Sequence, residues 1–180
     1  MLKRAIVIFP QCSHIELIQR LRQAYDPLAT ALPPHLTLVF PFESDISPEH
    51  LLRHLNSVAQ KFSPFQLLMR GITGHTNEYL FLNVKRGNDQ LIALHDQLYT
   101  GILAPYLIFH ETYVPHLTVG RLQDQTCFVE ALNQAQSVTA SFETEVQEIV
   151  AYRIEPNQKR EVECRVKFSQ SCGQRGCDII

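Results

Sequence analysis

Two similar stretches decide the fold: "PPHLTLVF" from Pro33 to Phe40 and "VPHLTVGR" from Val114 to Arg121. Each contains Pro-His-Leu-Thr followed by an aliphatic residue, and His116 follows His35 by 81 residues. The aliphatic and β-branched residues after the proline predict a strand in both places. A repeat of this length predicts duplication at the scale of a half-domain, because solenoid arrays use periods of about 20 to 50 residues and many copies.

The alternation of a strand determines which motif side chains lie together. Residues i and i+2 lie about 6.5 to 7 Å apart on the same face. His35 and Thr37 therefore share one face, as do His116 and Thr118, while the leucines beside them belong to the core. One histidine and one threonine on an outer strand face are commonplace and would be structural. The second copy favours function, since a pseudo-two-fold axis would bring both pairs to one cleft.

The rest of the chain alternates between predicted strands and helices. We expect further strands at 5–9, 65–72 and 79–84 and on either side of "EPNQK" near Pro156. We expect helices with N-caps at Ser13 (a capping box with Glu16), Ser47, Asn88 and Asp124. The sequence "TGHTN" predicts a turn after the strand at 65–72, with Gly and Asn as turn residues. This order predicts a mixed α/β (α+β) domain in which each repeat heads a strand, helix, strand, strand unit.

Composition limits the classes of function. At 180 residues and 45% hydrophobic, the chain can form one globular unit. A formal charge of −2 and a pI near 6.4 argue against a general nucleic-acid coat but leave a small phosphorylated ligand open. The apolar run at 5–9 is too short for export or for spanning a membrane. The 5 cysteines lack regular spacing, so we expect no disulfide framework and a cytoplasmic location.

The paired motifs resemble those of the two-histidine (2H) phosphoesterase superfamily, which includes 2′-5′ RNA ligase-like proteins and cyclic nucleotide phosphodiesterases. Its signature is two His-x-Thr/Ser-x motifs with hydrophobic residues at x, here "HLTL" at His35 and "HLTV" at His116. The resemblance extends from about Arg4 to Phe168. It implies a bilobal fold with antiparallel sheets around a central groove and helices outside, and metal-independent chemistry on cyclic phosphates or 2′-5′ linkages.

The expected domain covers residues 1–168, with half-domains at about 1–86 and 87–168. Residues 169–180, "SQSCGQRGCDII", show no period and are predicted to form a flexible tail. We expect a monomer that acts on a cyclic nucleotide or an RNA end and does not bind a membrane.

The chemistry of such substrates asks for the residues that the motifs supply. Opening a 2′,3′-cyclic phosphate needs a base for the attacking water and an acid for the departing ribose oxygen. His35 and His116 can fill both roles, because an imidazole with a pKa near 6.5 exists in both protonation states. The hydroxyls of Thr37 and Thr118 can donate to the non-bridging oxygens. Arg121 stands five positions after the second histidine, where RNA ligase-like relatives carry an arginine.

Aromatic side chains are candidates for stacking on a base, with core packing as the alternative for each. Phe9 is the first choice, because relatives in the resembled family often carry an aromatic at the end of the first strand. Tyr113 and Phe42 are further candidates. The basic stretch Lys159–Lys167 protects a sheet edge or contacts an RNA backbone.

Two alternatives stay open at this point. One is a non-catalytic nucleotide- or RNA-binding module on the same fold. The other is a metal-dependent hydrolase, which would need at least three convergent ligands. His110 and Glu111 do not provide such a set, so we expect no metal and no cofactor. The histidines at 14, 50, 54, 75 and 95 are predicted to have no direct role.

Overall fold

The computed structural model describes residues 1–169. Along the chain the elements are β1 (Leu2–Ile8), α1 (Ile15–Tyr25), β2 (Leu36–Ser44), α2 (Pro48–Ala59), β3 (Phe65–His75), β4 (Tyr79–Arg86) and α3 (Asn88–Leu98). There follow the 3₁₀ helix η1 (Gly101–Tyr106), β5 (His116–Arg121), α4 (Gln125–Gln136), β6 (Ser141–Val146), β7 (Glu148–Ile154) and β8 (Arg160–Lys167). The expected strands and helices are all present, and β6 is one strand more than the sequence patterns predicted.

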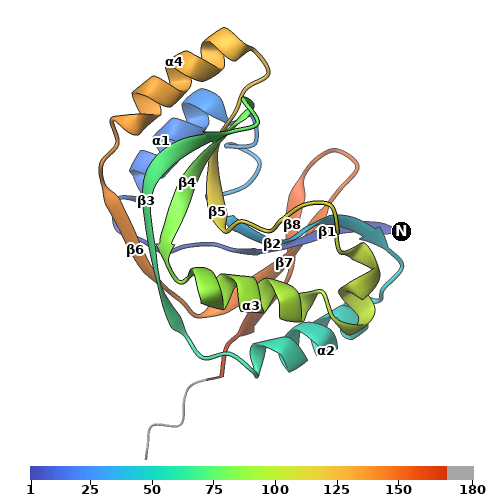
Figure 1. The fold of residues 1–180 in the computed structure, drawn as a ribbon. Coiled ribbons are helices and arrows are strands. Elements are labelled where there is room, and N and C mark those ends of the chain that lie inside the picture. The colour runs from blue at the N-terminus through green and yellow to red at the C-terminus, as the bar shows by residue number, and fades with distance from the viewer. Residues whose placement is uncertain (170–180) are drawn as a thin grey trace, which may run out of the picture.

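The strands form an antiparallel sheet in the order β6-β3-β4-β5-β2-β1-β7-β8. We call β6-β3-β4-β5 the β5 half-sheet and β2-β1-β7-β8 the β2 half-sheet. The two halves meet at the centre of the molecule, where the two motif strands, β2 and β5, lie side by side (Figure 1). Within residues 1–169, β2 pairs with β5 through a single residue pair, Leu36 with Leu117. The predicted mixed fold with antiparallel strands is confirmed, and the two sheets are continuous through this pair.

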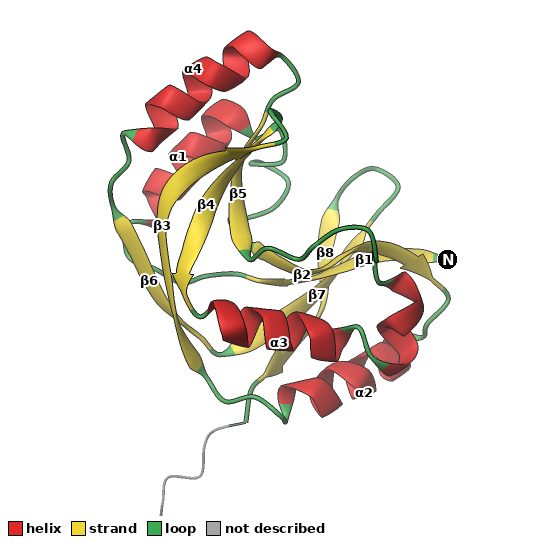
Figure 2. Ribbon diagram, viewed as in Figure 1, coloured by secondary structure: helices red, strands yellow, loops and turns green. Residues whose placement is uncertain are grey.

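The helices lie outside the sheet, as predicted (Figure 2). Helices α1 and α4 pack on the β5 half-sheet, and α2 and α3 pack on the β2 half-sheet. Helix α1 follows β1 of one half-sheet but packs on β5 of the other, and α3 follows β4 but packs on β2. Each motif strand is thus covered by a helix that arrives from the opposite half.

The core contains the motif leucines that the alternation assigned to it. Leu36, Leu38 and Leu117 are each 0% exposed. Gly120 allows α1 to pack closely on β5, because a Cβ there would lie 3.1 Å from Tyr25 Cβ and 3.0 Å from a methyl of Leu80. This close approach brings the end of α1 beside Arg121, the last residue of β5.

Two of the four predicted helix caps are confirmed. Ser47 Oγ accepts from the His50 amide and Asp124 Oδ1 accepts from the Cys127 amide. The other two are wrong. His14, in a left-handed conformation, precedes α1 in place of Ser13. Gly87, with φ 91°, precedes α3 in place of Asn88, because glycine has no Cβ to oppose a positive φ.

The predicted turn between β3 and β4 is shorter than the sequence suggested. Thr76 and Asn77 take positive φ and form the turn, whereas Gly74 lies inside β3 opposite Leu80. Of the residues predicted as a tail, 170–180 lie outside the described residues. Among residues 1–169, no helix combines the length and the apolar character needed to cross a membrane.

Candidate active site

The register between β2 and β5 places the four motif side chains in one cluster. Leu36 pairs with Leu117 in antiparallel register. Continued by one residue in each direction, this register sets His35 against Thr118 and Thr37 against His116. All four residues alternate with the core leucines and therefore share a face. Directly opposed residues have Cβ atoms about 5 Å apart, and diagonal ones about 7 to 8 Å. The two histidines therefore lie on a diagonal of this arrangement.

His35 is 8% exposed and is fixed by the loop before it. Its Nδ1 lies 2.9 Å from the carbonyl oxygen of Pro33. Because a carbonyl only accepts, Nδ1 carries the proton and Nε2 has the lone pair. Burial lowers the pKa of His35 to about 4; the charges of Arg22 and Arg121 add to this shift, and the Pro33 hydrogen bond opposes it. The ring is therefore neutral over most of the pH range.

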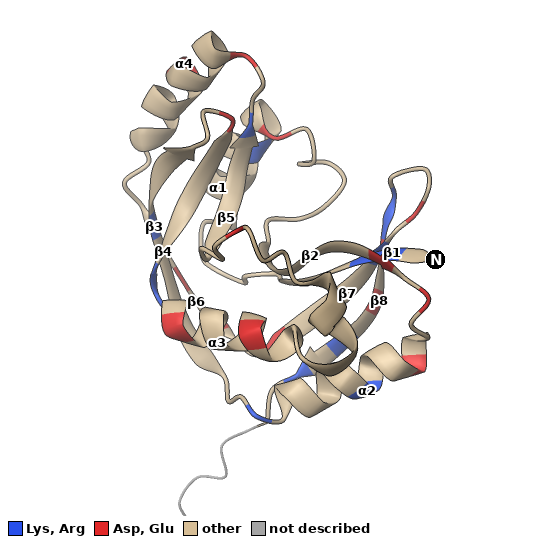
Figure 3. Ribbon diagram, turned by 45° about the vertical axis from the view of Figure 1, so that its right-hand side comes forward, with Lys and Arg blue, Asp and Glu red and all other residues tan. Residues whose placement is uncertain are grey.

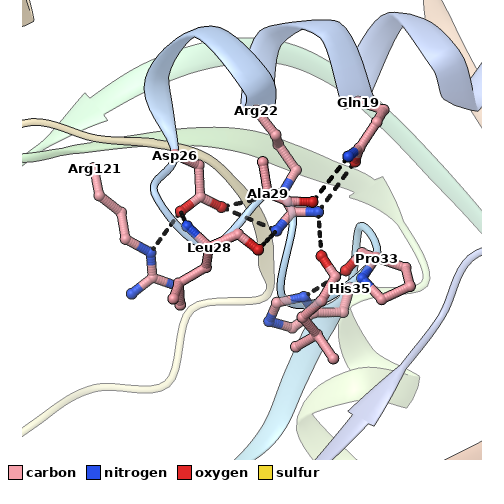
Figure 4. A network of polar contacts seen from close by, with 9 residues as sticks. Gln19, Arg22, Asp26, Leu28, Ala29, Pro33, His35 and Arg121 are labelled. Carbon is pink, nitrogen blue, oxygen red and sulfur yellow. Dashed lines mark hydrogen bonds and ion pairs between the residues drawn. The ribbon is translucent and has the colours of Figure 1, made fainter. Parts of the chain in front are cut away.

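A cluster of charged side chains lies beside His35 (Figure 4). Arg22, fully buried on α1, pairs with Asp26 at 3.0 Å and donates 2.7 Å to the carbonyl of Leu32. Arg121 Nε lies 3.2 Å from the other oxygen of Asp26. That N–H does not point at the oxygen, so this contact is an ion pair without a hydrogen bond. One carboxylate faces two guanidinium groups, which leaves positive charge for an anion.

His116 has a different environment. Its Nδ1 lies 2.7 Å from the carbonyl oxygen of Val114, so its tautomer matches that of His35. Its ring stacks on Phe81, with centroids 3.6 Å apart and planes 20° apart, and His75 stacks on Phe81 at 5.0 Å. Burial lowers the pKa of His116, and the charges of His75 and Arg121 act in the same direction while the Val114 hydrogen bond opposes them.

The predicted base-stacking residues lie in three places. Phe9 is half-buried beside His35, with ring centroids 6.4 Å apart in an edge arrangement, and the guanidinium of Arg165 lies 6.0 Å from the Phe9 ring. Tyr113 stacks on His95, at 3.8 Å and 6°. Phe42 is 6% exposed and packs in the core against Tyr106. Phe9 is therefore the only one of these three whose ring lies against a motif histidine.

Tyr113 belongs to a row of side chains that binds the backbone of β2. Its hydroxyl donates to Thr37 O at 3.0 Å, and burial raises its pKa. His95 Nδ1 donates to Leu38 O at 2.8 Å, and Tyr99 Oη accepts from the Phe40 amide at 3.1 Å. These hydrogen bonds pair backbone groups of β2 where that strand diverges from β5 and lacks a partner strand. His95, predicted to have no direct role, is thus part of the frame of the site.

Two of the four basic side chains in the stretch 159–167 are paired with acids. Arg165 contacts Glu148 at 2.7 Å and Lys159 contacts Glu161 at 2.6 Å. Basic and acidic segments are interspersed over the molecule (Figure 3). Within residues 1–169, no three His, Cys, Asp or Glu side chains are grouped so that they could hold a metal ion.

Sequence reasoning missed Arg22, Asp26 and Phe81. Neither Arg22 nor Asp26 stands in a motif, and their place depends on α1 crossing to the β5 half-sheet. Phe81 alternates with Tyr79 and Asn83 along β4, a pattern that indicates an outward face but not its neighbour. The pairing of Phe81 with Thr118 supplies that neighbour.

Comparison with known proteins agrees with the arrangement of the two motifs. Residues 10–158 match the family described as the 2′-5′ RNA ligase superfamily. The chain belongs to this family. A Geobacillus kaustophilus protein named "Putative phosphoesterase" is 30% identical over 150 residues, which cover 81% of this chain and 84% of that protein. A Bacillus cereus protein of the same name is 32% identical over 123 residues, 67% of this chain and 70% of that protein.

Solved structures share the fold. The crystal structure of TT0787 of Thermus thermophilus has a TM-score of 0.65 and 15% identity, and covers 94% of this chain and 99% of that one. Escherichia coli LigT complexed with 3′-AMP has a TM-score of 0.58 and 19% identity, with 94% and 99% covered. Family and fold together support a 2H phosphoesterase function for this member of the 2′-5′ RNA ligase superfamily.

Proposed function

We propose that the chain is a metal-independent phosphoesterase that acts on 2′,3′-cyclic phosphate or 2′-5′ linked RNA and nucleotide substrates. The observation that carries this proposal is the register of β2 and β5. It sets His35 and His116 diagonally on one face, each flanked by a threonine hydroxyl. General acid and base catalysis on a phosphodiester needs two such groups on opposite sides of phosphorus.

We assign the base to His35 and the acid to His116. The lowered pKa of His35, about 4, leaves its Nε2 free to accept a proton from water. The water oxygen then bonds to phosphorus while the bond from phosphorus to the ribose oxygen breaks. Nε2 of a protonated His116 donates to that departing oxygen. The products are a phosphomonoester and a free ribose hydroxyl, and the two rings exchange protons with solvent before the next turnover.

Substrate binding supports the proton on His116. In the free protein burial lowers the pKa of His116. A bound phosphate brings negative charge beside the ring and favours its cationic form. The stacked Phe81 face acts in the same direction, because an aromatic face attracts a cation.

The remaining groups stabilise charge on the phosphate. Thr37 and Thr118 donate to the non-bridging oxygens, and the guanidinium of Arg121 contacts the same oxygens as charge shifts on them. Microscopic reversibility allows the same acid and base to join a ribose hydroxyl to an activated phosphate, which is the reverse 2′-5′ ligase reaction.

The test is a substrate panel assayed in the presence of EDTA. It contains 2′,3′-cyclic nucleotides, RNA with a cyclic phosphate end and 2′-5′ dinucleotides, with the position of the product phosphate resolved. We expect turnover of at least one class, unchanged by the chelator. Binding without turnover of any class would favour the non-catalytic module, and turnover that requires added divalent ions would favour the metal-dependent hydrolase.

A further inference from the structure

A cavity of about 770 Å³ lies next to the proposed active site. The end of α1, the turn between β3 and β4, and the segment from β5 into α4 form its walls. Tyr79, Arg121, Asp26 and Cys127 are among the lining residues, and neither motif histidine is. The cavity is thus separate from the catalytic pair and larger than a phosphate requires.

Arg121 connects the cavity to the histidines. It lines the cavity, it is the last residue of the motif strand β5, and its charge lowers the pKa of both His35 and His116. Its guanidinium carbon lies 5.8 Å from the centre of the Tyr79 ring. Tyr79 in turn lies 6.0 Å from Phe81, which stacks on His116. A phosphate bound by Arg121 therefore contacts a side chain that also lines the cavity.

The cavity wall suits an uncharged nucleoside. Tyr79 is half-buried and offers an aromatic ring, and Gln23 and Gln123 offer amides for hydrogen bonds. Glu78 and Asp124 add carboxylates, which disfavour a second phosphate and can accept from amino groups of a base. The volume falls within the about 300 to 1,000 Å³ that small-molecule sites occupy.

We propose that this cavity binds the second nucleoside of a substrate that carries a nucleoside on each side of the reacting phosphate. The preferred substrate class is then a 2′-5′ linked dinucleotide unit, and a cyclic mononucleotide leaves the cavity empty. This inference rests on the proposed phosphoesterase function. A smaller cavity of about 460 Å³, lined by Phe9, Cys12 and Leu32, lies on the His35 side and is the competing location.

Each cavity contains one cysteine, which allows both to be tested. Cys127 is exposed on the first turn of α4 and lines the larger cavity, whereas Cys12 lines the smaller one. The first experiment compares Cys127→Trp, which fills the larger cavity, with Cys127→Ser as the control. We expect Cys127→Trp to lower kcat/KM for a 2′-5′ dinucleotide by about 10-fold or more, the loss of one stacked base. Turnover of a 2′,3′-cyclic mononucleotide should change less than about twofold.

The second experiment measures thiol alkylation of the full chain by peptide mass spectrometry, and it needs no turnover. The His116→Ala variant is labelled alone, with a 2′-5′ dinucleotide, or with a cyclic mononucleotide. We expect the dinucleotide to slow labelling of Cys127 at least about fivefold, because a nucleoside bound in the cavity keeps the alkylating reagent away from the thiol. The mononucleotide should leave the labelling rate of Cys127 unchanged.

The outcomes separate the two proposals. Protection of Cys12 but not Cys127, or protection of neither, overturns the cavity assignment. Equal losses on both substrates in Cys127→Trp with no protection of Cys127 also overturn it. Protection of Cys127 in a protein whose wild type hydrolyses neither substrate supports the cavity assignment and refutes the phosphoesterase function.

Discussion

His35 and His116 stand in the same tetrapeptide and make the same local hydrogen bond, yet their surroundings differ. Each ring donates from Nδ1 to the carbonyl two residues earlier, Pro33 or Val114. His35 is then enclosed by a loop tied to Arg22 and Asp26. His116 instead lies against the face of Phe81.

A duplicated motif can therefore supply two different catalytic groups. Burial lowers the pKa of both rings, and the charge of Arg121 acts in the same direction on both. Arg22 adds to the shift at His35, whereas the stacked face of Phe81 at His116 favours a proton on that ring. Titratable pairs whose environments push their pKa values apart are the usual acid and base of an active site. The repeat supplies two identical groups, and the elements packed against it make them different.

Removal of either imidazole is the largest change that tests this comparison. We expect His35→Ala and His116→Ala each to lower kcat by about 10² to 10⁴, the usual loss for a general acid or base. His50→Ala is the matched control, because His50 is exposed on α2. Circular dichroism should show both active-site variants folded. Near-normal turnover in one of them would mean that the two copies do not share the reaction.

Removal of the Arg121 guanidinium should affect both copies at once. We expect Arg121→Ala to lower kcat/KM by about 10², as for loss of a donor to a developing anion. Arg121→Lys should retain more kcat/KM than Arg121→Ala because it keeps the positive charge. It should stay below the wild type, since an ammonium group does not reproduce the planar guanidinium. The pKa of both histidines should rise toward 6.5, because Arg121 lowers both. Arg86→Ala, at an exposed arginine of β4, serves as the control. Unchanged kinetics in Arg121→Ala would remove this residue from the site.

A substitution at Phe81 should affect His116 without affecting His35. Phe81→Leu keeps an apolar side chain beside His116 but removes the stacked ring. We expect kcat to fall about 3- to 10-fold, and the high-pH limb of kcat/KM to move to lower pH, because the cationic ring loses support. The low-pH limb, which belongs to His35, should stay in place. Movement of both limbs together would contradict separate environments.

The smallest effect on activity is expected from loss of the hydrogen bond between Tyr113 and the backbone of β2. Tyr113→Phe removes the hydroxyl that donates to Thr37 O. We expect the free energy of unfolding to fall by about 1 kcal/mol, the net value of one hydrogen bond, with kcat changed less than about threefold. Urea titration and steady-state kinetics measure the two quantities. A large loss of activity at unchanged stability would give Tyr113 the direct contact with substrate that the sequence suggested.

The sequence predicted the features that depend on local patterns. The motif strands, the shared face of His35 and Thr37, and the caps at Ser47 and Asp124 follow from alternation and from side chains that reach their own backbone. Strand β6 was missed although "SFETEV" alternates between exposed and buried residues. The strand is short and contains two glutamates, which are uncommon in strands, so its alternation was not recognised as a strand pattern.

The rest of the site depends on long-range packing. Asp26 contacts Arg121 only because α1 crosses from one half-sheet to the other and Gly120 lets it approach β5. Phe81 reaches His116 only through the pairing of β4 with β5. No local pattern marks either contact, so the sequence alone could not divide the roles of the two histidines.

The most direct measurement of that division is a proton NMR titration of the two imidazole rings, with signals assigned from His35→Ala and His116→Ala. We expect His35 to titrate near pH 4. Burial lowers the pKa of His116 as well, and its assignment as the acid requires a pKa above that of His35. A base must be neutral and an acid protonated, so kcat/KM should rise through the first pKa and fall through the second. Equal pKa values for the two rings, or a higher pKa for His35 than for His116, would contradict the assignment of His35 as base and His116 as acid.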